Sequence, residues 1–207
     1  MSSQLRPAID EDADGIIALI ARCYADYPPN VLDVDGEEPE LRTPASSFDW
    51  FWVLEVNGEI LGSIAAANYG DAIEMKKYYI HPKLRGTGQG RKLHEAFLDY
   101  VRQQGVHKIV LWTDTRFDLA HKVYTHMGYR PTGQSRELHD ISDTTEFHFE
   151  MTLPQPLAGR ETASLLQCRI NSHYIPFPFL HPCHPQSLPG LLSTKHLLSR
   201  RTLSSPF

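Results

Sequence analysis

A glycine-rich segment in the middle of the chain has the residue types and spacing of an anion-binding loop. Its residues are Arg85, Gly86, Thr87, Gly88, Gln89, Gly90 and Arg91. They lie between a predicted strand and a predicted helix. There the first backbone N–H groups of the helix have no internal partner, and the helix dipole favours negative charge. Glycines let a phosphate approach the backbone, and the two arginines can add charged hydrogen bonds. The segment therefore predicts a phosphate site, although a plain turn could have the same residues.

The spacing of these glycines excludes the two common phosphate motifs, and the surrounding residues resemble a third. The loop lacks the Gly-Lys-Ser/Thr ending of a P-loop and the G-x-G-x-x-G of a dinucleotide-binding fold. The segment from Glu74 to Pro82, followed by the loop, instead resembles motif A of the GNAT superfamily of N-acetyltransferases. A second segment, Ala120 to Tyr129 (AHKVYTHMGY), is similar to that family's A-x-x-L-Y-E-K-x-G-F. The resemblance covers residues 4–153.

This resemblance implies an activity and a donor substrate. The activity is transfer of an acetyl group from acetyl-CoA to a primary amine of a small molecule or protein, by direct attack in a ternary complex and without a metal. The pyrophosphate would bind the amides of the glycine loop. The pantetheine arm would pair with the end of the preceding strand, at Tyr78, Tyr79 and Ile80. A backbone N–H there would polarise the thioester carbonyl, a contribution of about 3 kcal/mol.

Two side chains are candidates for the proton transfers that this reaction requires. An alkyl ammonium has a pKa near 10 and must lose a proton before it attacks. Glu74 is the candidate base, through a water molecule, because some members of the family have a glutamate at this place. Tyr124 is the candidate acid for the departing thiolate, because it falls on the family's tyrosine. A surface glutamate and a core tyrosine are the structural alternatives. Histidines could also relay protons, and the candidates are His81, His121, His126 and His148.

The acceptor is expected to bind near the stretch from Tyr24 to Trp50. This stretch holds five closely spaced acids, Asp33, Asp35, Glu37, Glu38 and Glu40. It also holds the aromatic residues Tyr24, Tyr27, Phe48 and Trp50. Acids would attract a cationic amine and aromatic rings could hold it, which favours a polyamine-like, amino-acid or lysine acceptor. Solubility alone would also explain an acidic loop.

A non-catalytic acyl-CoA-binding or sensor module is the alternative from another functional class. Members of the family often have asparagines where this chain has Asp114 and Phe117. A module that kept the glycine loop and lost turnover would tolerate such departures. Substitution of Glu74 and Tyr124 distinguishes the two, because a pure binder should be indifferent to both changes.

Periodicity and turn residues predict the elements that position these groups. Strands are expected at 4–9, 51–56, 59–66, 72–80, 107–113, 129–137 and 146–153. Helices are expected after Asp14, after the glycine loop, and at about 118–127. Asn57-Gly58 is the strongest two-residue hairpin signal, and Pro82 closes a strand because it has no N–H for the ladder. The fold class is α/β, with a GNAT-like mixed and mostly antiparallel central sheet flanked by helices.

Composition divides the chain into two parts. Residues 1–153 contain 15 Lys+Arg and 24 Asp+Glu, whereas residues 154–207 contain five and one, so that charges of −9 and +4 make up the total of −5. The second part, with eight of the fifteen prolines, is expected to be a disordered extension of the acetyltransferase domain. The acidic balance argues against nucleic acid. The sequence shows no apolar leader or membrane-spanning segment, and three cysteines cannot make a complete set of disulfides. We therefore expect a cytoplasmic protein that is not bound to a membrane. The resemblance leaves room for a homodimer.

Overall fold

A computed structural model describes residues 3–154 of the chain. The proposed extension at 154–207 lies outside these residues except for Pro154. The strands are β1 (Ser3–Pro7), β2 (Trp50–Val56), β3 (Glu59–Tyr69), β4 (Ala72–Ile80), β5 (Lys108–Asp114), β6 (Arg130–Glu137) and β7 (Thr145–Thr152). The α-helices are α1 (Ala13–Tyr24), α2 (Pro44–Ser47), α3 (Gln89–Gln103) and α4 (Asp118–His126). All of the strands expected from the sequence are present, with ends shifted by at most three residues and β4 matching its expected range at both ends.

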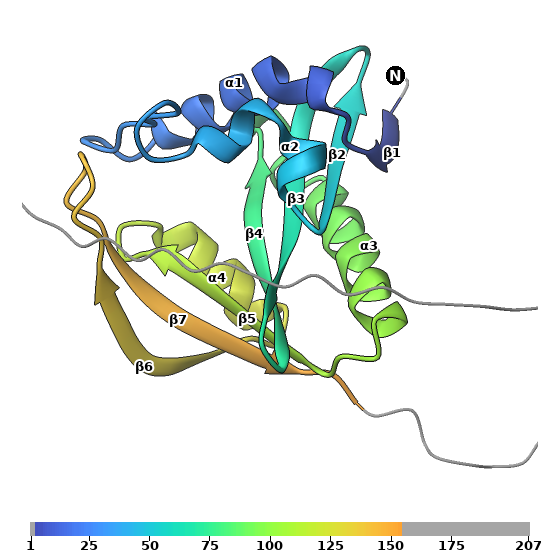
Figure 1. Cartoon of the computed structure of the whole chain (residues 1–207), viewed down its shortest axis with the longest axis vertical. Coiled ribbons are helices and arrows are strands. Elements are labelled where there is room, and N and C mark those ends of the chain that lie inside the picture. The colour runs from blue at the N-terminus through green and yellow to red at the C-terminus, as the bar shows by residue number, and fades with distance from the viewer. Residues whose placement is uncertain (1–2, 155–207) are drawn as a thin grey trace, which may run out of the picture. The chain divides into compact units, whose positions relative to one another are not determined.

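The strands form one sheet in the order β1-β2-β3-β4-β5-β7-β6. Every neighbouring pair is antiparallel except β4 and β5, which run parallel. This mixed, mostly antiparallel sheet with flanking helices confirms the predicted fold class. In Figure 1, β4 and β5 start side by side at the bottom of the view and diverge upward. Among residues 3–154, no helix has the length and apolar character needed to cross a bilayer.

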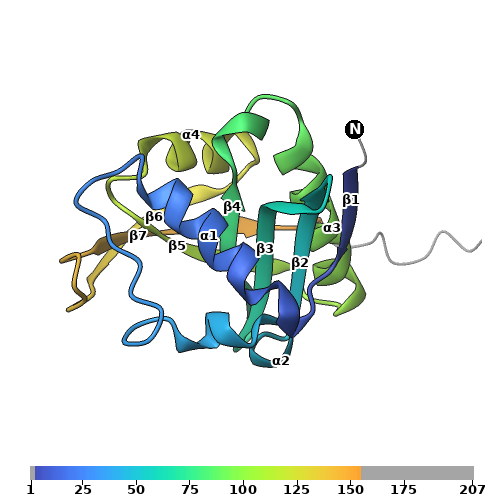
Figure 2. The same ribbon diagram turned by 90° about the horizontal axis from the view of Figure 1, so that it is seen from above.

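The two faces of the sheet carry separate apolar cores. The larger core includes Leu93, Phe97 and Val101 from α3, all fully buried. The other lies under α1, where Ile16 and Ile20 pack against the inward residues of β2 and β3. Figure 2, seen from above, shows α1 lying across β3 and β4. These contacts follow from the spacing of three or four residues between apolar positions, which places them on one side of each helix.

Local turn chemistry explains where several elements end. Asn57 and Gly58 have φ of 53° and 84°, the left-handed pair that a two-residue hairpin turn between β2 and β3 requires. Gly128, with φ of 99°, follows the end of α4 as a helix-terminating glycine. The four-residue helix α2 and the single turn at Pro39–Arg42 were not predicted, because elements this short have no apolar period to detect.

Candidate active site

The site begins where β4 and β5 separate. Their parallel register covers only Ala72↔Lys108, Ile73↔Ile109 and Glu74↔Val110. Beyond Glu74, β4 continues to Ile80 with β3 on one side, and the described residues place no strand on the other. Its backbone on the open side is therefore available to a ligand. A cavity of about 750 Å³ lies along this opening.

A β-bulge shapes the free part of β4. The register with β3 shifts between Ser63 and Ala65, and Lys77 has φ of 50°, a left-handed conformation that is uncommon for a residue with a side chain. The hydroxyl of Ser63 donates to the carbonyl oxygen of Lys77 at 2.7 Å and holds the distortion in place. Bulges re-aim the strand that carries them. This bulge lies directly before Tyr78, at the strand end expected to bind pantetheine.

The glycine loop forms the end of the cavity next to α3. Gly86 and Gly88 have φ of 77° and 82°, and Gly88 is the residue before the helix begins. Gly90 serves another purpose, since a Cβ there would lie 3.0 Å from the hydroxyl of Tyr78, which donates to the Gly90 carbonyl at 2.9 Å. The amides of the first turn of α3 have no acceptor within the helix and remain available to an anion.

The predicted donor-binding residues are brought together, with a few exceptions. Those that line the cavity are Tyr78, Tyr79, Ile80, Arg85, Gly86, Gly88, Gly90 and Arg91. Thr87 and Gln89 are not part of its lining, and the Thr87 hydroxyl donates to the carbonyl of Leu84 at 2.7 Å. Arg85 pairs with Asp26 at 2.8 Å, and the exposed Arg91 pairs with Glu95 at 2.9 Å. Both arginines thus already have carboxylate partners.

Tyr124 reaches the cavity from α4. Its side chain is buried beside the rings of Tyr78, Tyr129 and Phe149. Burial strongly raises the pKa of the Tyr124 hydroxyl, and its hydrogen bond with Thr113 lowers it by less. The hydroxyl therefore stays protonated at neutral pH, as a proton donor must.

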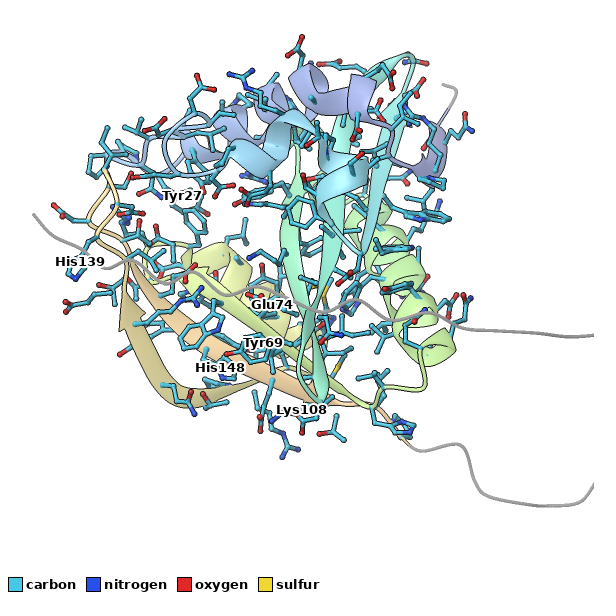
Figure 3. All side chains as sticks on the ribbon, viewed as in Figure 1. Tyr27, Tyr69, Glu74, Lys108, His139 and His148 are labelled. Carbon is cyan, nitrogen blue, oxygen red and sulfur yellow. The ribbon has the colours of Figure 1, made fainter. Side chains whose placement is uncertain are left out.

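Glu74 lies at the narrow end of the opening and has a second carboxylate near it. Its side chain is 12% exposed, with Lys76 Nζ at 3.8 Å. Glu146, on β7, also lines the cavity and pairs with Arg136 of β6 at 2.7 Å. Burial raises the pKa of Glu146, Arg136 lowers it, and the negative charge of Glu74 raises it further. Figure 3 shows Glu74 low in the opening and Tyr27 at its wide end.

Trp112, Glu146 and Arg136 were missed by the sequence analysis. They occupy neighbouring strands in the order β5, β7 and β6, and the guanidinium of Arg136 lies 4.3 Å from the centre of the Trp112 ring. The available signal was the alternation of polar residues on the last strand, Glu146, His148 and Glu150. Alternation marks a face that is not covered by apolar packing.

Of the four histidines considered as proton relays, three lie outside the lining of the cavity and the fourth, His126, is part of it. His148 is buried, its Nδ1 is 2.9 Å from the hydroxyl of Thr132, and burial lowers its pKa. His121 Nε2 is 2.9 Å from the carbonyl oxygen of Asp114, and His81 Nδ1 accepts from the amide of Lys83. Among residues 3–154, no three His, Cys, Asp or Glu side chains are grouped as metal ligands would be.

The segment between α1 and β2, residues 25–49, which we call the strap, crosses to the far side of the cavity. The side-chain amide of Asn30 donates to the Asp114 carboxylate at 3.0 Å, and the backbone N–H of Val31 donates to the Ser142 hydroxyl at 3.0 Å. Glu37 accepts from the amide of Ile141 at 2.6 Å. The strap is therefore joined to β5 and to the turn between β6 and β7, across more than eighty residues of sequence.

Asp114 and Phe117, which stand where the family often has asparagines, both contact the strap. Asp114 accepts a forked pair of hydrogen bonds from Arg116 in addition to that from Asn30. Phe117 packs on Tyr27 and Tyr24, with ring centres at 4.8 and 5.9 Å. Tyr24 and Tyr27 line the cavity as expected.

The other two aromatic residues expected near the acceptor lie elsewhere. Phe48 packs on Phe51 in the core under α1, and Trp50 stacks on Trp52 and Tyr100 toward α3. Neither lines the cavity. Strand alternation sends Trp50 to the face opposite α1, which the residue types alone did not indicate.

Comparison with known proteins agrees with the motifs. The model of the acetyltransferase (GNAT) family matches residues 16–129. An acetyltransferase of Pectobacterium atrosepticum is 31% identical over 108 residues, which cover 52% of this chain and 74% of that protein. The crystal structure of an acetyltransferase from Streptococcus agalactiae superposes with a TM-score of 0.63 at 21% identity, over 73% of this chain and 98% of the other. YncA of Salmonella typhimurium, a putative acetyltransferase solved with acetyl-CoA, gives 0.57 at 17% identity, over 78% and 99%.

Proposed function

The chain belongs to the acetyltransferase (GNAT) family, and we propose that it moves the acetyl group of acetyl-CoA to a primary amine, by direct attack while both substrates are bound. The observation that carries this proposal is the separation of β4 from β5 beside a cavity that runs from the glycine loop to Glu74. One end of that cavity suits a pyrophosphate and the other a cationic amine. The reaction needs no metal ion.

The residues present fit acetyl-CoA as the donor. The left-handed glycines and the first-turn amides of α3 form a concave set of N–H donors for a pyrophosphate. The free backbone of β4 after the bulge can pair with the amide groups of a pantetheine arm, as a missing strand would. Family membership and a similarly folded structure with acetyl-CoA bound support the same choice.

The side chains then divide the proton transfers between them. A thioester supplies an activated acyl carbon, and a backbone N–H at Tyr78 to Ile80 stabilises negative charge on its oxygen. The acceptor ammonium loses its proton to Glu74 through water. The new C–N bond forms as the C–S bond breaks, and the nitrogen releases its second proton to water. Tyr124 protonates the leaving sulfur and regains a proton from water. The position of Tyr124 in the cavity supports this role, and its hydroxyl carries a proton at neutral pH.

The same proposal includes the organisation and setting of the chain. Residues 1–153 would form the acetyltransferase domain, and residues 154–207 an extension outside it. Acetyl transfer would take place in the cytoplasm, on a small-molecule or protein amine, without nucleic acid or membrane. A homodimer is compatible with this reaction.

Acetyl-CoA titration with thermal unfolding as the readout tests the donor. A ligand at a hundredfold its Kd stabilises by about 2.7 kcal/mol, which raises Tm by roughly 2–4 °C per kcal/mol in a domain of this size. We expect this shift with acetyl-CoA and desulfo-CoA but not with ATP. Amines are then screened by release of free thiol. A thermal shift without thiol release from any amine, unaffected by substitution of Glu74 and Tyr124, would identify the non-catalytic binding module instead.

A further inference from the structure

The strap covers the acceptor end of the cavity and is held there by contacts with distant parts of the chain. The strap is joined to β5 through Asn30 and Asp114, and to the turn between β6 and β7 through Val31 and Ser142. A third connection lies at the bulge of β4, where the ammonium of Lys77 contacts the carboxylates of Glu38 and Glu40 and is nearly buried. The strap is thus attached to β4 on one side of the opening and to β5 and the turn between β6 and β7 on the other.

This attachment limits what can reach the acyl group. A lysine on a folded protein brings its neighbouring surface with it, and that surface would have to separate the strap from Asp114 or Ser142. A small molecule needs only to fit within a cavity of about 750 Å³ that it shares with part of the donor. The connections therefore favour a small acceptor.

The charges around the cavity indicate what kind of small amine it accepts. Eight carboxylates and five Lys or Arg side chains line it, and two of those five, Arg85 and Arg91, belong to the glycine loop. Arg116, outside the lining, pairs with Asp114, and the remaining carboxylates at the acceptor end still outnumber its cations. An acceptor with a carboxylate of its own would be repelled there, whereas one with additional positive charge would be attracted.

Glu74 and Glu146 line the same cavity, where a second ammonium group of the acceptor could lie between them. Each already has one cation beside it, Lys76 Nζ at 3.8 Å from Glu74 and Arg136 at 2.7 Å from Glu146. The negative charges of the two glutamates repel each other, and both side chains line the cavity with limited exposure to water. A cation near both carboxylates offsets that repulsion. The ring of Trp112, already contacted by the Arg136 guanidinium, adds an aromatic face to the same wall.

We propose that the acceptor is a small, flexible amine with a second positive charge, such as a linear diamine, and not a lysine or N-terminus of a folded protein. This inference rests on the proposed acetyltransferase function. It narrows the acceptor from any primary amine to one chemical class. It also assigns Glu146 a role in choosing between acceptors.

A matched set of acceptors tests the inference on the full chain with acetyl-CoA. Cadaverine has a second ammonium, pentylamine has the same carbon chain without it, and aminovalerate has a carboxylate in its place. Cytochrome c serves as the folded, lysine-rich protein. Thiol release gives kcat/KM for the three amines, and intact mass gives acetylation of the protein. We expect cadaverine to exceed pentylamine by about tenfold, as a partly buried ion pair would give. Aminovalerate should be slowest and the protein unmodified.

The variant Glu146→Gln separates acceptor choice from chemistry. Its readout is the ratio of kcat/KM for cadaverine to that for pentylamine, in which a general loss of activity cancels. We expect this ratio to fall to within about threefold of one. Glu150→Gln is the matched control, because Glu150 lies on the same strand and face, pairs with Lys108 and does not line the cavity. It should leave the ratio unchanged.

The outcomes distinguish this inference from the function on which it rests. Equal rates for cadaverine and pentylamine, or faster acetylation of cytochrome c than of cadaverine, would overturn the diamine assignment while acetyl transfer stands. A ratio unaffected by Glu146→Gln would overturn the role of Glu146. Failure of all the amines to release thiol would instead count against the acetyltransferase function.

Discussion

The half of the sheet beneath α1 and the half beneath the strap differ in the side chains they present to their covers. Beneath α1, the inward positions are Val53 and Ala65, fully buried against Ile20. Beneath the strap, the same alternation presents polar groups such as Glu74 and Glu146. The same face of the sheet is therefore apolar where a helix covers it and polar where a loop covers it.

The difference teaches which part of the molecule supports the other. Burial of apolar surface stabilises the fold by about 25 cal/mol per Å², whereas a buried ion pair often contributes little net stability. The half beneath α1 therefore contributes more to the stability of the fold than the half beneath the strap. The half beneath the strap can keep carboxylates for chemistry at small cost to stability.

Truncation of a buried side chain in the covered half should have the largest effect. Ile20→Ala removes most of a side chain that is 1% exposed between α1 and the sheet. We expect the free energy of unfolding to fall by about 3 kcal/mol, measured by urea denaturation. Activity per folded molecule should remain near that of the parent chain. Ile17→Ala, at a partly exposed position on the same helix, should cost clearly less. Equal costs would contradict the comparison.

At Glu74 we expect a large loss of activity and little loss of stability. Glu74→Gln removes the proposed base and keeps the size of the side chain. We expect kcat/KM to fall about a hundredfold, within the range for loss of a general base. The free energy of unfolding should change by less than about 0.5 kcal/mol. Glu59→Gln, at the exposed start of β3, is the control for both measurements. A large loss of stability in Glu74→Gln would mean that the open half is also structural.

Acidification should destabilise the fold because it favours protonation of the buried His94. Burial lowers the pKa of His94 on α3 to about 4, and its Nε2 is 2.9 Å from the hydroxyl of Tyr129. The unfolded chain, with a histidine pKa near 6.5, binds more protons than the folded one between these values, so stability falls as the pH falls. The loss between about pH 7 and pH 5 should be about 2 kcal/mol. His94→Gln should remove most of this slope in pH-dependent unfolding, and an unchanged slope would assign it to other groups.

Loss of the side chain that holds Asp114 and Ser142, the two residues to which the strap donates hydrogen bonds, should cost less stability. Arg116→Met removes the hydrogen bonds that Arg116 donates to Asp114, Ser142 and Thr144. We expect a loss of about 1.5 kcal/mol in unfolding free energy and a raised KM for the acceptor with less change in kcat. Arg102→Met, which breaks an exposed pair with Asp99, should cost less than about 0.5 kcal/mol. An unchanged acceptor KM would show that the strap does not organise the site.

Removal of the extension should have the smallest effect. A chain of residues 1–153 keeps Leu153, which is buried and donates its amide to the carbonyl of His107 at 2.7 Å. We expect its unfolding free energy to stay within about 0.5 kcal/mol of the full chain and its kcat/KM to be unchanged. Failure of this shorter chain to fold would refute the proposed boundary.

Local signals in the sequence were sufficient for most of the fold. Asn57-Gly58 marks a hairpin turn, Gly128 ends a helix, and the apolar run of β5 marks a central strand, because each depends on neighbours along the chain. The glycine loop and Tyr124 were found in the same way, by short motifs, and both line one cavity.

The rest of the site depends on contacts that no local pattern specifies. Trp112 lies opposite His148 because β7 pairs with β5, and a shift of one residue in that register would turn either side chain to the other face. Asp114 receives hydrogen bonds from residues both 84 positions before it and two after it. Such pairings follow from strand order, which the sequence pattern left open.

The strand order also affects how the chain is made. Only three residue pairs join β5 to β4, and its other neighbour, β7, is complete only at Thr152. During synthesis β5, with its run Ile109-Val110-Leu111-Trp112, must therefore wait with one edge uncovered until almost the whole domain has left the ribosome. Uncovered apolar edges of this kind pair readily with other chains. We expect aggregation of the newly made protein to originate at β5, the strand that later forms one wall of the cavity.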